Sequence, residues 1–101
     1  MGFSSDVKVV TKTADASAVV GRTRLQGLYF TNTGTGSSFT LRNGTVVGAA
    51  AVMTITTPAA AGGQDIIIPN DGLLFENGIF IDVNDVNVTS VTLFFVGGAA
   101  A

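Results

Sequence analysis

The sequence predicts an all-β fold, an antiparallel two-sheet sandwich of about seven or eight strands with Greek-key or jelly-roll-like connections. Short stretches rich in Thr, Val, Ile and Phe alternate between apolar and polar residues, which is typical of strands with one buried face. Turn residues interrupt these stretches about every 8 to 12 positions, as in sandwiches and barrels. The 101 residues suit one domain with a modest core.

Three segments are expected within this single domain. Residues 1–20 form an N-terminal strand or arm, in which residues 6–13 are a plausible strand, while residues 14–21 fit either a short helical turn or a loop. Residues 21–97 form the sandwich. Residues 98–101 follow as a tail of small residues, which we expect to be flexible.

The middle of the chain is predicted to form a hairpin from about residue 24 to residue 56. Asn43-Gly44 is a strong signal for its turn, because both residues tolerate a positive φ. Alternation along the strands assigns one set of side chains to the core. This set is Leu28, Phe30, Phe39, Leu41, Met53 and Ile55.

The second half continues with short strands. The apolar run of residues 66–68 predicts a strand covered on both faces, and residues 73–83 predict two short strands that meet in a tight turn at Asn77-Gly78. A last strand covers about residues 90–96. The core positions expected in this half are Ile79, Ile81, Val83, Val91, Leu93 and Phe95.

Two aromatic residues are left on the opposite faces of their strands, because successive side chains of a strand alternate between its faces. These are Phe80 and Phe94. We expect Phe94 to be covered either by residues 1–20 or by another subunit. Arg22 and Arg24 share one face of their strand, where they are either solvated or paired with acidic groups of a neighbouring chain. These four residues are the interface candidates.

The composition argues against catalysis and against binding of nucleic acid or membranes. Charged residues make up only 12% of the chain, its net charge is −2, and no basic run offers a footprint for nucleic acid. Histidine and cysteine are absent, so the commonest general base, the commonest transition-metal ligand and thiolate metal ligands are missing, and the plentiful Ser and Thr hydroxyls have no evident activator. No apolar run approaches the roughly 18 residues of a membrane span. We therefore expect no catalytic, cofactor or metal site.

Two acidic patterns are candidate sites. The DVNDVN stretch at residues 82–87 carries oxygen ligands of the kind that calcium prefers, but its spacing departs from the calcium-binding loop, and a turn is the favoured interpretation. Glu76 and Asp82 could form a carboxylate pair, yet nothing around them indicates a sugar cleft. Solvated side chains are the favoured interpretation there too.

Several stretches resemble a group of small virion structural proteins of tailed bacteriophages, over about residues 20–97. They are TRLQGLYFTNTGTGSSFTLRNG, TITTPAAAGG, DIIIPNDGLLFENGIFIDV and NVTSVTLFFVGG. The resemblance implies a short β-sandwich without enzymatic activity, located on the capsid surface as a cement or decoration protein that bridges major capsid subunits. A tail or neck component is the alternative within the virion.

Self-association is expected as well, because a small sandwich has open sheet edges that must be paired or covered. A cyclic oligomer such as a homotrimer would cover an edge and bury outward apolar residues. The alternative outside the virion structural class is a carbohydrate-binding module for host recognition. It is disfavoured because such modules offer aromatic platforms, and this chain has no Trp and one Tyr.

Overall fold

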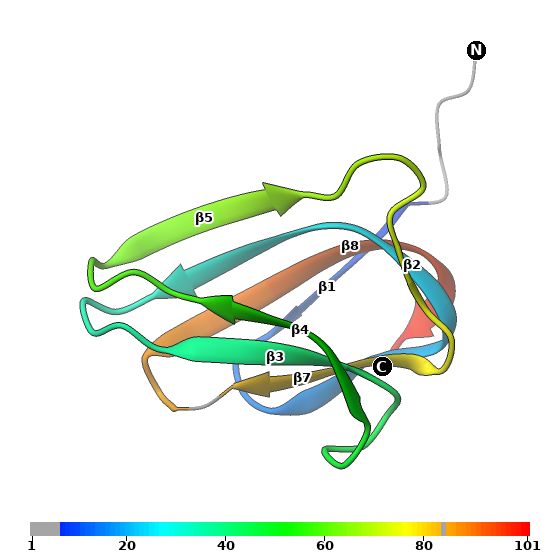
Figure 1. The fold of residues 1–101 in the computed structure, drawn as a ribbon, viewed down its shortest axis with the longest axis horizontal. Helices are drawn as coiled ribbons and strands as arrows, with labels where there is room; N and C mark the ends of the chain where they lie inside the picture. Colours follow the sequence, from blue (N-terminus) through cyan, green and yellow to red (C-terminus); the bar gives the residue numbers. More distant parts are fainter. Residues whose placement is uncertain (1–6, 84) are drawn as a thin grey trace.

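A computed structural model describes residues 7–83 and 85–101, which form eight antiparallel strands and no helix (Figure 1). The predicted all-β antiparallel fold is confirmed. The strands are β1 (Lys8–Lys12), β2 (Ala16–Asn32), β3 (Ser38–Asn43), β4 (Ala50–Thr56), β5 (Gly62–Ile67), β6 (Leu73–Phe75), β7 (Gly78–Val83) and β8 (Val88–Ala100).

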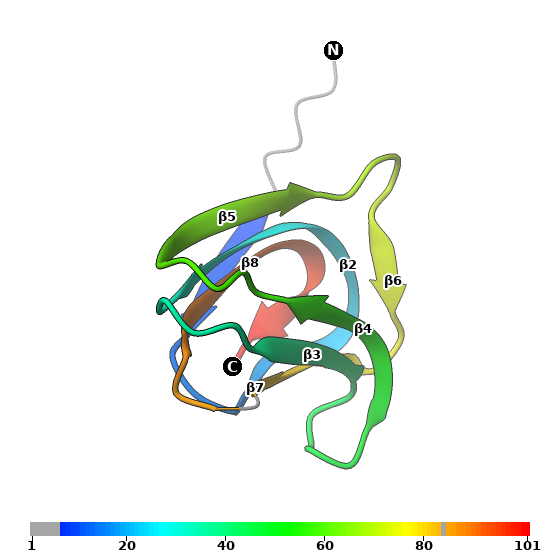
Figure 2. The same ribbon diagram turned by 60° about the vertical axis from the view of Figure 1, so that its left-hand side comes forward.

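One continuous sheet wraps around the core instead of two separate sheets. The order of the strands is β1-β8-β2-β7-β3-β4, and β5 and β6 also pair with β2. The strands β5, β2, β8 and β1 form one layer, and β7, β3 and β4 form the other (Figures 1 and 2). The rings of Phe30 of β2 and Phe39 of β3 pack edge to face, with their centroids 5.4 Å apart, although these strands do not pair. The core therefore lies between the two layers.

The long strands β2 and β8 carry the hydrogen bonding from one layer to the other. β2 pairs with β7 through residues 16–20 and with β6 and β5 through residues 23–32. Between these stretches Gly21 has a φ of 93°, and its partner strand bends at Gly97 and Gly98, with φ values of 79° and 59°. Because glycine tolerates a positive φ, both strands can turn here without ending.

The alternation predicted for the core is largely confirmed. Most of the predicted positions have at most 9% of their surface exposed, whereas Met53 and Val83 are partly buried against the core. The predicted positions that are buried are Leu28, Phe30, Phe39, Leu41, Ile55, Ile79, Ile81, Val91, Leu93 and Phe95. The prediction for residues 66–68 is wrong, because Ile67 is 80% exposed. β5 has only one covered face, since nothing in the described chain lies over its outer side.

The predicted hairpin from residue 24 to residue 56 forms only in its second part, where β3 pairs with β4. β2 does not pair with β3, because its two edges are taken by β8 on one side and by β5, β6 and β7 on the other. The predicted turn between β6 and β7 is also wrong. Both strands run along the same edge of β2, one after the other.

The two Asn-Gly pairs contact each other instead of each closing a tight hairpin. The side-chain oxygen of Asn43 accepts a hydrogen bond from the backbone N–H of Asn77 at 2.9 Å. The backbone N–H of Gly44 donates to the carbonyl oxygen of Gly78 at 3.0 Å. These contacts hold the step between β6 and β7 against the end of β3.

Both ends of the described chain pair with β-strands. β1 lies along the outer edge of β8, and β2 begins at Ala16, so most of residues 14–21 is strand and not a helical turn or loop. Residues 98–100, expected to belong to a tail, are the end of β8, and the flexibility of this segment stays a prediction. Lys8 and Lys12 donate to the carbonyl oxygens of residues 98 and 101 at 2.8 Å each. Backbone pairing, unlike side-chain packing, does not need large residues, so a segment of small residues can extend β8.

Candidate interaction surface

The outer side of the layer formed by β1, β8, β2 and β5 carries a row of apolar positions. Val9 pairs with Phe94, Phe94 pairs with Gly27, and Gly27 pairs with Ile67. We call these four residues the Phe94 row. Paired residues of neighbouring strands point to the same face, so the side chains of this row stand next to one another on the outside of the sheet.

The Phe94 row is open to solvent in the described chain. Phe94 is 37% exposed, Val9 55% and Ile67 80%. A shallow pocket of about 200 Å³ lies between Phe94 and Ile67, above Gly27. Gly27 cannot carry a side chain here, because a Cβ would stand 2.9 Å from the carbonyl oxygen of Ile66.

Of the two expected covers for Phe94, residues 7–20 do not provide one. β1 lies beside β8 in the same layer and places Val9 next to the ring instead of over it. The remaining residues of the expected N-terminal segment, 1–6, lie outside the described residues. A second subunit therefore remains a candidate cover for the Phe94 row.

Charged and polar residues flank the Phe94 row on both sides. On one side Arg24 pairs with Val96, and on the other Tyr29 pairs with Thr92 and Asp65. Tyr29 is 41% exposed. The outer surface of this layer therefore has an apolar centre with a cation at one end and a carboxylate at the other.

Arg22 and Arg24 share the outer side of β2, as predicted, because Thr23 between them is buried. The Nε of Arg22 lies 3.7 Å from a carboxylate oxygen of Glu76, and both side chains are about 60% exposed, at 62% and 60%. An exposed pair of this kind contributes little to stability. Whether either arginine meets a neighbouring chain stays a prediction.

Phe80 lies on the outer side of the other layer, so the structure does not bring it together with Phe94. It is half-buried and pairs with Arg42 of β3 and Ser17 of β2. Arg42 also binds Asp82 through two nitrogens, at 2.9 and 3.0 Å, with side-chain exposures of 26% and 18%. Asp82 is therefore paired with a cation and is not a solvated side chain. Glu76 lies near Arg22, so Glu76 and Asp82 each face an arginine.

The pairing of Arg42 with Asp82 was not predicted from the sequence. The available signal is alternation, because Arg42 follows the inward Leu41 and Asp82 follows the inward Ile81. Their proximity depends on β3 and β7 being neighbours, and these strands are far apart in the sequence.

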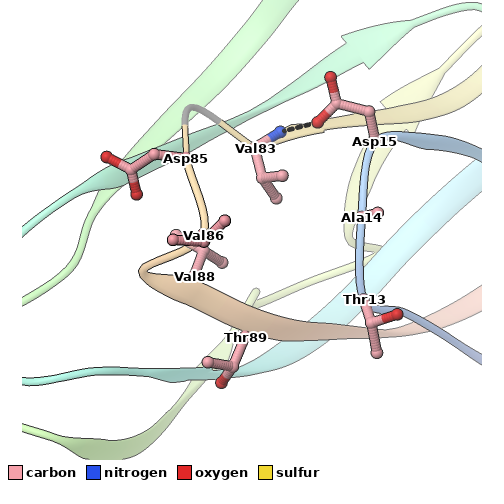
Figure 3. Close-up of a pocket in the computed structure, with 8 residues that line it drawn as sticks. All are labelled: Thr13, Ala14, Asp15, Val83, Asp85, Val86, Val88 and Thr89. Carbon is pink, nitrogen blue, oxygen red and sulfur yellow. Dashed lines mark hydrogen bonds between the residues drawn. The ribbon is translucent and has the colours of Figure 1, made fainter.

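A larger pocket, of about 540 Å³, lies between residues 13–15 and the connection from β7 to β8 (Figure 3). Its lining is largely apolar, with Val83, Val86 and Val88. Asp15 accepts a hydrogen bond from the backbone N–H of Val83 at 2.8 Å, and the carboxylate of Asp85 points away from Asp15 (Figure 3). The two acids therefore do not converge on a common ligand.

The DVNDVN stretch behaves as a turn in its described part, while Asn84 lies outside the described residues. Asp85 accepts hydrogen bonds from the backbone N–H of Asn87 and from the hydroxyl of Ser37, both at 2.9 Å. Across residues 7–83 and 85–101, no three side chains of the metal-binding types gather in one place. The same residues contain no helix with the length and apolarity to cross a membrane.

Because of these hydrogen bonds to Asp85, we expect the stability of the protein to depend on pH. The bond from the backbone of Asn87, followed by that from Ser37, holds the pKa of Asp85 below its usual range. A lowered folded-state pKa means that the stabilisation is present above the unfolded-state pKa and is lost as the pH falls through the folded-state value.

We expect an Asp85→Asn variant to be slightly less stable than the wild type at pH 7. The difference should shrink as the pH falls below about 4, where the unfolded-state carboxyl is protonated. Urea unfolding of both proteins across this range measures it. A difference that stays constant with pH would show that ionised Asp85 is not the cause.

Comparisons with known proteins give little further information. No protein-family model matches the chain, and no curated protein matches it. Among solved structures, the coat protein of Tobacco streak virus aligns with 98% of this chain and 91% of its own, with a TM-score of 0.41 and 11% sequence identity.

Proposed function

We propose that this protein is a non-enzymatic structural protein of a phage virion, a cement or decoration protein on the capsid surface that bridges neighbouring major capsid subunits. The observation that carries the proposal is the exposed Phe94 row on an outer sheet face. Large apolar side chains gathered on an open face are typical of protein interaction sites. The resemblance of the strand and turn motifs to small phage virion proteins supports the virion as the setting.

The surface chemistry fits a covering role better than a catalytic one. The chain has 12 charged residues in 101, from 5 basic and 7 acidic side chains. The Phe94 row offers apolar contact area and no groups for acid–base or nucleophilic chemistry. A partner that covers the row would remove three exposed apolar side chains from water.

Self-association belongs to the same proposal, with the major capsid protein as the second partner. Burying a fully exposed Phe contributes about 1.5–3 kcal/mol before the costs of association. Phe94 is 37% exposed, so it contributes a fraction of this, and burial of Val9 and Ile67 adds to it. The homotrimer expected from the sequence is one form of this assembly that stays untested, and a two-fold dimer is a competing form.

The location of the protein in purified particles tests the proposed function. We expect an antibody or a tag on the chain to label the capsid surface in electron micrographs, at regular positions between capsid subunits. Absence of label from the capsid would contradict the cement role. Label confined to the tail or neck would establish the alternative virion role instead.

A further inference from the structure

We propose that two copies of this chain pair face to face through their Phe94 rows, about a two-fold axis that runs along the row. Arg24 of each copy then faces Tyr29 of the other, within reach of Asp65 on the neighbouring strand. The inference deepens the proposed function, since it rests on the self-association and names its contact surface.

The strand register places the two charges symmetrically about the row. Along β8, Phe94 lies two residues from Val96 and two residues from Thr92, which is about 7 Å in each direction. Val96 pairs with Arg24 of β2. Thr92 pairs with Tyr29 of β2, and Tyr29 pairs with Asp65 of β5. The cation and the carboxylate therefore flank the Phe94 row at equal distances, on opposite sides.

Neither charge has an ion-pair partner among residues 7–83 and 85–101. Within the described residues, the ion pairs are those of Arg22 with Glu76 and of Arg42 with Asp82. Arg24 and Asp65 take part in neither. An unpaired cation and an unpaired carboxylate at the two ends of one apolar face are complementary to a second copy of that face.

The charges also select the direction of the axis. Rotation about an axis along the Phe94 row brings the Arg24 side of one copy onto the Asp65 side of the other, and two-fold symmetry repeats the contact. Rotation about an axis parallel to the strands would instead set Arg24 near Arg24, and like charges at an interface oppose association. Only the rotation about the Phe94 row places both Arg24 and Asp65 near an opposite charge of the second copy.

The apolar centre of the face fits this pairing. The axis passes through the row, so the Phe94 side chains of the two copies meet near the centre, flanked by Val9 and Ile67. The pocket of about 200 Å³ beside each ring gives room for the rings to pack side by side and offset, which aromatic pairs prefer. Aromatic anchors with charged residues at the periphery are typical of protein interfaces.

The first experiment measures the mass of the purified full chain by size-exclusion chromatography with light scattering, over a range of concentrations. We expect a dimer that dissociates on dilution. A Phe94→Asp variant should be monomeric at concentrations where the wild type is dimeric, because the charge would be buried at the axis. Val86→Asp is the matched control: Val86 is 87% exposed and lies away from the Phe94 row, and this variant should remain dimeric.

The second experiment exchanges the charges, and it does not depend on a substitution in the apolar row. Arg24→Asp and Asp65→Arg should each raise the dimer dissociation constant about tenfold, because each places like charges opposite one another at two symmetric contacts. The double variant restores opposite charges and should return to within about threefold of the wild type. Circular dichroism checks that each variant is folded.

A wild type that is monomeric at all concentrations, or trimeric, would overturn the inference. So would a double variant that associates no better than the single ones. These results are separable from the proposed function: capsid labelling without dimers would refute only the pairing, and dimers without capsid labelling would refute only the virion role.

Discussion

A Phe95→Ala variant is expected to lose about 3–5 kcal/mol of unfolding free energy, the usual range for removing a buried phenylalanine. Phe95 has no exposed surface and lies in the middle of β8, where it pairs with Leu25 of β2 and Lys8 of β1. Truncation leaves a cavity between the two layers that the paired strands cannot close. Small domains have a total stability of about 5–15 kcal/mol, so the variant should be close to unfolding.

The neighbouring ring is the matched control for this prediction. Phe94→Ala removes the same atoms from the outer face, where the ring is 37% exposed, and should cost about 1 kcal/mol or less. Urea unfolding at concentrations where the chain is monomeric separates this effect from association. Equal losses for both variants would contradict the assignment of the two rings to opposite faces.

The second large effect is expected at Gly78, the first residue of β7. Its φ is 114°, and a Cβ at this position would stand 2.4 Å from the carbonyl oxygen of Val19 on β2. A Gly78→Ala variant combines an unfavourable backbone conformation, which by itself costs about 1–3 kcal/mol, with a clash against backbone. β7 would have to move away from β2, with a further loss of pairing.

Gly48→Ala is the control for this substitution. Gly48 lies in the exposed connection between β3 and β4, and a Cβ there would have no atom within 4 Å. We expect this variant to keep the stability of the wild type or to gain a few tenths of a kcal/mol from reduced freedom of the unfolded chain. A Gly78→Ala protein as stable as Gly48→Ala would contradict the close approach of Gly78 to the backbone of Val19.

The sequence was a good guide to which side chains face inward. In β8 the alternation correctly separated Phe94 from Phe95, because a strand has only two faces and the apolar residues at positions 91, 93 and 95 mark one of them. In β2 the prediction held for Leu28 and Phe30. It did not foresee that Leu25 is also buried, because a register shift between Leu25 and Gly27 moves the alternation by one residue.

The partners of the strands were much harder to predict. Asn-Gly is a local signal and favours a hairpin wherever it occurs, yet Asn43-Gly44 and Asn77-Gly78 end up in contact with each other. The sequence before and after Gly78 does not show that β6 and β7 share the same edge of β2. β6 and β7 share that edge because β8 pairs along the other edge of β2.

The candidate surface was predicted in part. Alternation placed Phe94, Arg22 and Arg24 outward, and the described structure agrees. Val9 and Ile67 could not be assigned to the same surface, because they belong to strands that are distant in the chain and meet only through β8 and β2. The role of this surface as an interface stays a prediction.

The sequence by itself determined the strand class, most of the inward positions and the outward direction of Phe94. These properties depend on the two-residue period of a strand, which is local. Only the tertiary structure decided which strands are neighbours, how one sheet wraps around the core, and that Val9, Phe94 and Ile67 form a row with Arg24 and Asp65 on its two sides. These properties depend on backbone hydrogen bonds between distant segments, and such bonds are formed by groups that every residue except proline carries alike.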